Sequence, residues 1–87
     1  MNIIEKLNKQ INRGRQAENA LRNETVKAAF EDVEKDILAS WASCDPHDEK
    51  RLMLLKMEQT ALQHVKDRIA LYINKAKSAE KELAKQR

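Results

Sequence analysis

The sequence contains very few of the residues that interrupt helices or build reactive sites. Its 87 residues include one glycine, one proline and one cysteine, and only 3% are aromatic. Ordinary domains carry several glycines and prolines because their turns need them, so we expect few turns and long elements here. The single cysteine excludes an internal disulfide bond and fits a reducing compartment. One glycine also excludes a glycine-rich phosphate loop.

Long apolar runs are absent from the sequence as well. None approaches the roughly 20 residues that a transmembrane helix needs, so we expect no membrane span. Glu5 and Lys6 place charge too early in the chain for a secretory signal peptide. These observations favour a soluble intracellular protein.

Charged residues are abundant, at 36% of the chain, and they lie in three blocks. Residues 1–23 carry five basic and two acidic side chains, residues 24–49 carry two and eight, and residues 50–87 carry ten and four. Two interpretations stay open: arms of opposite charge pack antiparallel with complementary rims, or the basic arms form a surface for nucleic acid. Basic residues alternate with acidic and apolar ones, which favours the first interpretation.

The composition and the hydrophobic pattern together predict an all-α fold in a single helical domain, residues 1–87. The domain would comprise an N-terminal amphipathic arm (1–22), an acidic helix (23–44) and a long basic helix (45–87). Helix 24–43 would pair with helix 46–85 in an antiparallel hairpin, to which the N-terminal helix is an addition. We expect such hairpins to assemble into an oligomeric helical bundle.

The N-terminal arm has an apolar stripe that is clear for two turns and then weakens. Ile4, Leu7 and Ile11 follow a spacing of three and four, and Gly14 falls where the stripe would continue. Glycine inside a helix costs about 1 kcal/mol relative to alanine, so a bend or fraying is expected near Gly14. Arg13 and Arg15 flank this glycine and are candidates for contacting phosphate.

The acidic helix has a complete apolar face. Spacings of four, three and four place on that face Val26, Phe30, Val33 and Ile37, with Trp41 following as a core anchor. Asn23 is a suitable N-cap for a helix that starts at Glu24. At the other end, Pro46 predicts that one helix stops and another starts, with Asp45 as N-cap and Pro46 as the first helical residue.

The long helix carries two different patterns. From Leu62 it follows a heptad repeat, made of Leu62, Val65, Ile69, Tyr72, Ala76, Ala79 and Leu83. The residues become small at Ala76 and Ala79, where a partner helix could approach closely. Nearer the turn, apolar residues surround most of the helix: Leu52, Met53, Leu54, Leu55 and Met57. One hairpin partner covers only one side of that cluster, which predicts a second copy on the other side.

The residues expected at interfaces follow from these patterns. They are Phe30, Trp41, Leu52, Met53, Leu54, Leu55 and Met57 of the hairpin, with Ile4, Leu7 and Ile11 of the arm. A basic docking surface is expected at the C-terminal end, formed by Lys75, Lys77, Lys81, Lys85 and Arg87.

Reactive side chains gather only at the turn. Cys44, Asp45, His47 and Asp48 are close in sequence, but structural zinc sites normally use four cysteine or histidine ligands, and this set has one of each. A nucleophilic Cys44–His47 pair would need a third orienting group and an oxyanion element, and neither is visible. We therefore expect no enzyme activity, no metal and no cofactor.

A block from Leu21 to Leu83 resembles a group of small uncharacterised helical proteins of tailed bacteriophages and prophages. The matching residues are Leu21-Arg22-Asn23-Glu24, Phe30, Val33-Glu34, Ile37, Trp41, Ser43, Asp45-Pro46-His47-Asp48, Arg51-Leu52, Leu62, Val65, Leu71, Ile73, Ala76 and Leu83. That group often has a glycine after its last apolar positions, where this chain has Asn74-Lys75. The resemblance implies a product of the virion-morphogenesis region with a role in head assembly, and it implies no functional residues.

The sequence thus predicts a non-enzymatic, self-associating helical protein that acts through protein–protein contacts. The resemblance places these contacts in phage particle assembly, with a coat, portal or other virion protein as partner and the host cytoplasm or the virion as location. The alternative is a small nucleic-acid-binding or regulatory protein that uses its basic arms.

Overall fold

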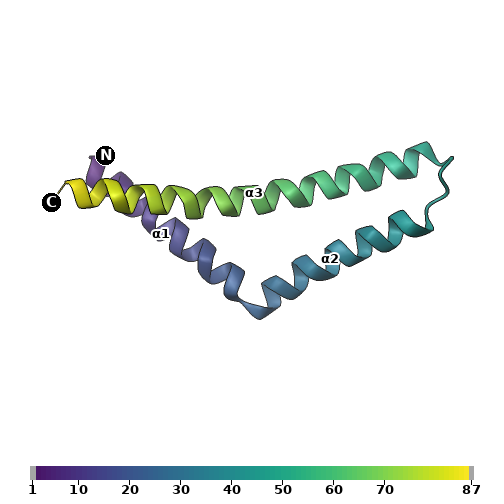
Figure 1. Cartoon of the computed structure of the whole chain (residues 1–87), viewed down its shortest axis with the longest axis horizontal. Helices are drawn as coiled ribbons and strands as arrows, with labels where there is room; N and C mark the ends of the chain where they lie inside the picture. The colour runs from purple at the N-terminus through teal and green to yellow at the C-terminus, as the bar shows by residue number, and fades with distance from the viewer. Residues whose placement is uncertain (1, 87) are drawn as a thin grey trace.

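Three helices make up the described part of the chain, residues 2–86 of a computed structural model. They are α1 (Ile3–Arg22), α2 (Glu24–Ser43) and α3 (Glu49–Lys85). Helices α1 and α2 follow one another along the much longer α3 and form a V against it, and both chain ends lie at the same end of the molecule (Figure 1). The predicted all-α fold, a hairpin with an added N-terminal helix, is confirmed. None of these helices is long and apolar enough to cross a membrane.

The change of direction between α1 and α2 takes place at Asn23 alone. Its backbone N–H donates to the carbonyls of Asn19 and Ala20, which ends α1. Its side-chain oxygen accepts from the backbone N–H groups of Thr25, at 3.0 Å, and Val26, at 3.1 Å. The same residue therefore closes one helix and caps the next, and the predicted N-cap is confirmed.

Asn23→Ala is expected to lower the free energy of unfolding by about 1 kcal/mol, because two amides at the start of α2 lose their acceptor. Chemical denaturation followed by circular dichroism measures the change. Asn12→Ala is the matched control, since Asn12 is exposed inside α1. That control should be neutral or slightly stabilising, because alanine has the higher helix propensity. Equal effects in the two variants would contradict the capping role.

The turn between α2 and α3 corrects the predicted start of the long helix. Asp45 accepts from the backbone N–H of His47 at 2.9 Å, and its carbonyl accepts from the N–H of Asp48 at 3.0 Å. Asp48 then accepts from the N–H of Arg51 at 3.1 Å. The side chain of Asp45 closes a local turn instead of capping a helix, so the helix begins at Glu49, three residues after the predicted Pro46. The N-cap is Asp48.

Helix α1 makes by far the most extensive contact with α3. Leu7, Ile11 and Ala79 form a buried core there, against which Leu83 packs. Farther along the same contact Ala17 and Ala76 are also buried. Close approach of the two helices at Ala76 agrees with the prediction from its small side chain.

Gly14 is the point of closest approach between α1 and α3. A Cβ atom added to Gly14 would overlap the Cβ of Ala76 and lie 2.9 Å from the carbonyl oxygen of Tyr72. The weak end of the apolar stripe on α1 is therefore a contact made by small residues. The fraying expected near Gly14 does not occur, since α1 continues as one helix to Arg22. Packing against α3 outweighs the low helix propensity of glycine.

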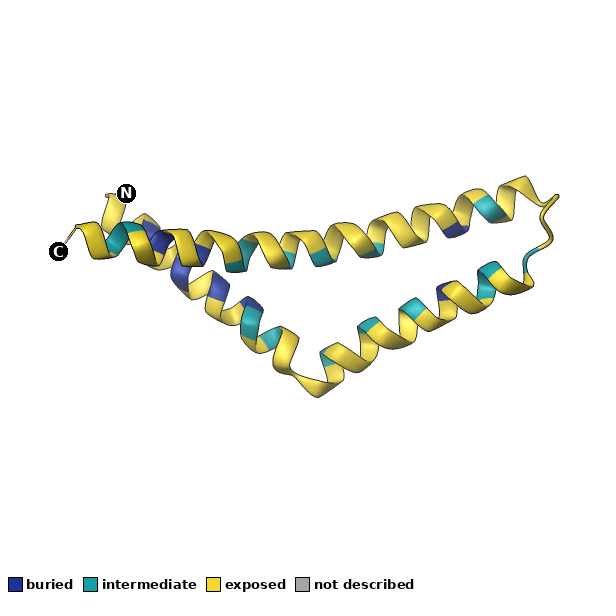
Figure 2. Ribbon diagram, viewed as in Figure 1, coloured by how far each residue is buried: buried dark blue, intermediate teal, exposed yellow. Residues whose placement is uncertain are grey.

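Helix α2 touches α3 far less. Buried positions concentrate where α1 meets α3, while α2 and the first half of α3 are mostly exposed (Figure 2). Ile37 and Leu55 are the buried residues of this half. Val33 and Val65, which the pattern assigned to the packed face, are instead 44% and 50% exposed, because α2 stays too far from α3 to cover them.

The open arrangement gives the molecule an extended shape. Its dimensions are 61 × 26 × 18 Å and its radius of gyration is 18.3 Å. A compact domain of this length has a radius of gyration of about 12 Å. Much of the apolar surface of the turn half is therefore left without an intramolecular partner.

Candidate interaction surface

A groove runs along one side of the molecule between α2 and α3. Its volume is about 500 Å³, and its walls are formed by Val33, Asp36, Ile37 and Ser40 of α2 and by Glu58, Ala61, Leu62 and Val65 of α3. Five of these eight residues are apolar. We call this feature the α2–α3 groove. Burying such a surface against a partner helix would be favourable, because the apolar groups would leave water.

The apolar wall of the groove continues along α3 toward the turn. Leu54, Met57, Ala61 and Val65 are separated by steps of three, four and four, which places them on one side of the helix. All four are exposed, and Met57 retains 61% of its accessible surface. Groove and stripe together form a surface long enough for several turns of a partner helix.

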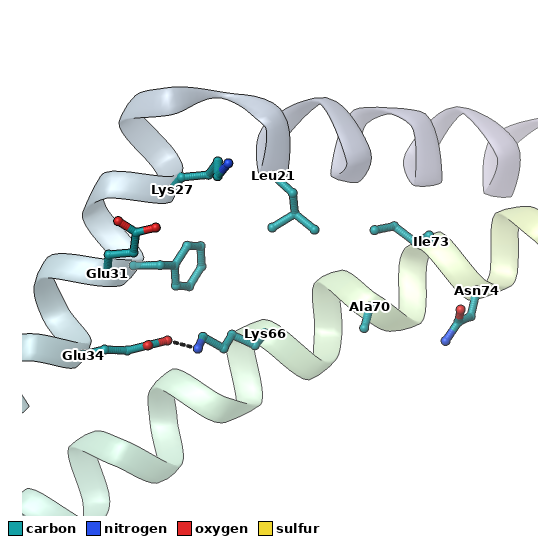
Figure 3. A pocket seen from close by; sticks show the side chains of 9 residues that line it. Leu21, Lys27, Glu31, Glu34, Lys66, Ala70, Ile73 and Asn74 are labelled. Atoms are coloured by element: carbon teal, nitrogen blue, oxygen red, sulfur yellow. Dashed lines mark ion pairs between the residues drawn. The ribbon is translucent and has the colours of Figure 1, made fainter.

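A second pocket, of about 480 Å³, lies where α1, α2 and α3 surround the centre of the molecule (Figure 3). Leu21 of α1 and Ile73 of α3 point into the space between the helices. At its edge Lys66 of α3 forms an ion pair with Glu34 of α2. Both side chains are about 40% exposed, so we expect this pair to contribute no more than about 1 kcal/mol. It is one of the few contacts that connect α2 to α3.

The predicted interface residues divide into three groups by burial. Leu7 and Ile11 are covered by α3, and Leu55 is completely buried within the chain, so these three belong to the intramolecular core. Phe30, Trp41 and Leu52 are half-buried. Exposed, and hence open to a partner, are Ile4, Met53, Leu54 and Met57.

The predicted basic docking residues lie on the last turns of α3. Lys75, Lys77, Lys81 and Lys85 are all exposed, and Arg87 lies outside the described residues. Helix α1 adds further cations at this end, among them Lys9 and Arg13. The two basic arms of the sequence thus meet at one end of the molecule (Figure 1). The acidic α2 lies toward the other.

The turn holds the reactive side chains that the sequence singles out. The half-buried thiol of Cys44 donates to the carbonyl of Asp45 at 3.6 Å. His47 is exposed, and its backbone takes part in the turn. Within residues 2–86, no three His, Cys, Asp or Glu side chains are grouped so that they could hold a metal ion. The hydrogen bonds that Asp45 and Asp48 accept here close the turn and cap α3.

Sequence reasoning missed two features of the surface. Val33 and Val65 were assigned to the core, although the spacing of Leu54, Met57, Ala61 and Val65 already indicates a second apolar stripe beside the buried one. The other missed feature is the contact made by Tyr72, which was assigned only to the heptad repeat. Its ring lies under the guanidinium group of Arg13, at 5.8 Å from ring centroid to Cζ.

Comparison of the chain with protein-family models, with curated proteins and with solved structures finds no match.

Proposed function

We propose that the chain is a non-enzymatic helical protein that self-associates through the α2–α3 groove. The observation that supports this most strongly is the amount of surface that the folded chain leaves exposed. The accessible area is 7047 Å². A compact monomer of 10.1 kDa exposes about 5300 Å², so about 1700 Å² remain in excess. A standard interface removes about 800 Å² from each partner.

The charges beside the groove support a second copy as its occupant. Asp32 and Asp36 lie one turn apart on the α2 side, while Lys50 and Arg68 lie at the two ends of the apolar stripe on α3. All four are exposed. In a two-fold arrangement that lays α2 of one copy over α3 of the other, the Asp32–Asp36 pair of each copy would approach one of these two cations. A two-fold interface requires such a self-complementary surface, and the product would be a four-helix bundle.

The wider role that we propose is structural, in the assembly of a phage particle within the host cytoplasm or in the virion itself. The resemblance of residues 21–83 to small phage proteins supports this setting. Self-association would present several basic ends at once, each with Lys75, Lys77, Lys81 and Lys85 exposed. Repeated basic ends suit docking to an acidic coat or portal surface, because several weak contacts act together.

Size-exclusion chromatography with light scattering tests the self-association. At micromolar concentration we expect a dimer or a larger species. Met57→Lys/Val65→Lys is expected to shift the chain to monomer, because burying two unpaired charges in the interface is strongly unfavourable. Its helical content should stay unchanged by circular dichroism, since both positions are exposed.

Leu38→Lys/Leu71→Lys is the matched control. Both leucines are exposed and neither lines the groove. This variant should keep the mass of the unsubstituted chain. An equal loss of mass in the two variants would show that the groove is not the interface. A cooperatively folding monomer at every concentration would overturn the proposal as a whole.

A further inference from the structure

A small cleft lies between α1 and the second half of α3, on the basic end of the molecule. Its volume is about 200 Å³, and its lining consists of Lys9, Gln10 and Arg13 from α1 with Tyr72 and Lys75 from α3. The three cations are exposed, whereas Gln10 and Tyr72 are half-buried. The cleft is therefore accessible from solvent and has a floor fixed by the packing of two helices.

Arg13 is positioned in this cleft by a contact between the two helices. Its Cζ atom lies 5.8 Å from the centroid of the Tyr72 ring, within the range of a cation–π interaction. The ring belongs to α3 and the arginine to α1, so the helix packing orients the guanidinium group. An oriented guanidinium group loses less conformational freedom when it binds an anion. Arg15, by contrast, lines a separate cleft beside Glu80.

The charges around the cleft favour the binding of an anion. None of the described residues that line it is acidic. Residues 2–23 and 68–86 together carry ten basic and four acidic side chains, whereas residues 24–67 carry six and ten. Packing of α1 on α3 brings the two basic segments to one end (Figure 1). A cleft lined by charge of one sign raises the local concentration of anions.

We propose that this cleft binds the backbone phosphates of a nucleic acid, with Arg13 as the bidentate ligand and Lys9 and Lys75 beside it. Arginine and lysine side chains are the usual phosphate ligands, and a guanidinium group matches two phosphate oxygens. Duplex DNA presents one negative charge per about 1.7 Å of its axis, so one segment can engage all three cations. An acidic protein surface fits this cleft less well, because its carboxylates belong to separate side chains. This inference is independent of self-association.

Fluorescence anisotropy with a labelled duplex oligonucleotide and the full chain tests the cleft. Three phosphate contacts should make the affinity fall about 40-fold between about 50 and 200 mM salt. Lys9→Gln/Arg13→Gln/Lys75→Gln should bind at least about tenfold more weakly at low salt, and its slope of log affinity against log salt should be smaller by about 3. Should that variant fail to fold, Lys9→Gln/Lys75→Gln tests the same cleft with a change in slope of about 2.

Lys27→Gln/Lys35→Gln/Lys56→Gln is the control, because it removes the same charge from exposed positions in the acidic half of the molecule. It should keep the affinity and the slope of the unsubstituted chain. Three results would overturn the proposal. They are no binding at about 50 mM salt, an equal loss of affinity in the control, or equally effective competition by polyglutamate and by unlabelled oligonucleotide. The last result would assign the cleft to carboxylates.

Discussion

Leu55→Ala is expected to lower the free energy of unfolding by about 2–5 kcal/mol, because it removes three carbon atoms from a fully enclosed site. Leu55 has 0% of its surface exposed. Helices α2 and α3 touch so little that this one side chain provides a large share of the packing in the turn half. A chain of this length has a total stability of about 4–13 kcal/mol, so the loss would be a substantial part of it.

Two signals measured in one denaturant titration show where the loss occurs. Circular dichroism reports on all three helices, while the fluorescence of Trp41, the single tryptophan, reports on the turn half. We expect fluorescence to change at lower denaturant than circular dichroism in Leu55→Ala. Leu38→Ala is the control, since Leu38 is 64% exposed on α2 and its truncation should cost less than about 1 kcal/mol. A loss in Leu55→Ala no larger than in the control would contradict the assigned role of Leu55.

Local signals in the sequence were sufficient to predict the helices. Asn23 and the capped turn before α3 are encoded within a few residues, and apolar spacing defines the faces of each helix. The error at the start of α3 arose because Asp45 and Asp48 are both able caps. Only the backbone geometry decides that Asp45 closes a turn and that Asp48 caps the helix.

The division of packing between the helices could not be predicted in the same way. The apolar face of α2 is richer than that of α1, so α2 looks like the better partner for α3. The structure instead gives α1 the extensive contact, because Gly14, Ala17, Ala76 and Ala79 allow the two backbones to approach closely. Small residues carry little weight in a hydrophobic pattern, although close approach adds dispersion contacts along the whole pair.

The candidate site was predicted only in part, because its position depends on how the helices pack. One side of the cluster from Leu52 to Met57 was expected to stay uncovered, and Met53, Leu54 and Met57 are exposed while Leu55 is buried. The groove beside them, with Val33 and Val65, was missed because it exists only where two helices diverge. How far the helices diverge depends on the angle between α1 and α2 at Asn23. The spacing of apolar residues does not predict that angle.

Gly14→Leu is expected to lower the free energy of unfolding by about 3 kcal/mol, although leucine is the better helix former by about 1 kcal/mol. Even a Cβ atom at this position would overlap Ala76 and lie 2.9 Å from the Tyr72 carbonyl oxygen. A leucine side chain would therefore force α1 away from α3 and disrupt the core around Leu7 and Ile11. Chemical denaturation measures the loss. Gln16→Leu, at an exposed position of α1, should change stability by no more than about 0.5 kcal/mol.

A double-mutant cycle isolates the close contact from helix propensity. Gly14→Ala alone should destabilise the chain, because the added methyl group meets Ala76 across the helix pair. Ala76→Gly alone should also destabilise the chain, because it removes one methyl group and replaces alanine by a residue with lower helix propensity. In the double variant the methyl group has moved from α3 to α1, and we expect a favourable coupling of about 1–2 kcal/mol between the sites. The rescue should be partial, since the Tyr72 carbonyl remains in place. Strict additivity, or a stabilising effect of Gly14→Ala alone, would show that α1 and α3 do not meet at this glycine.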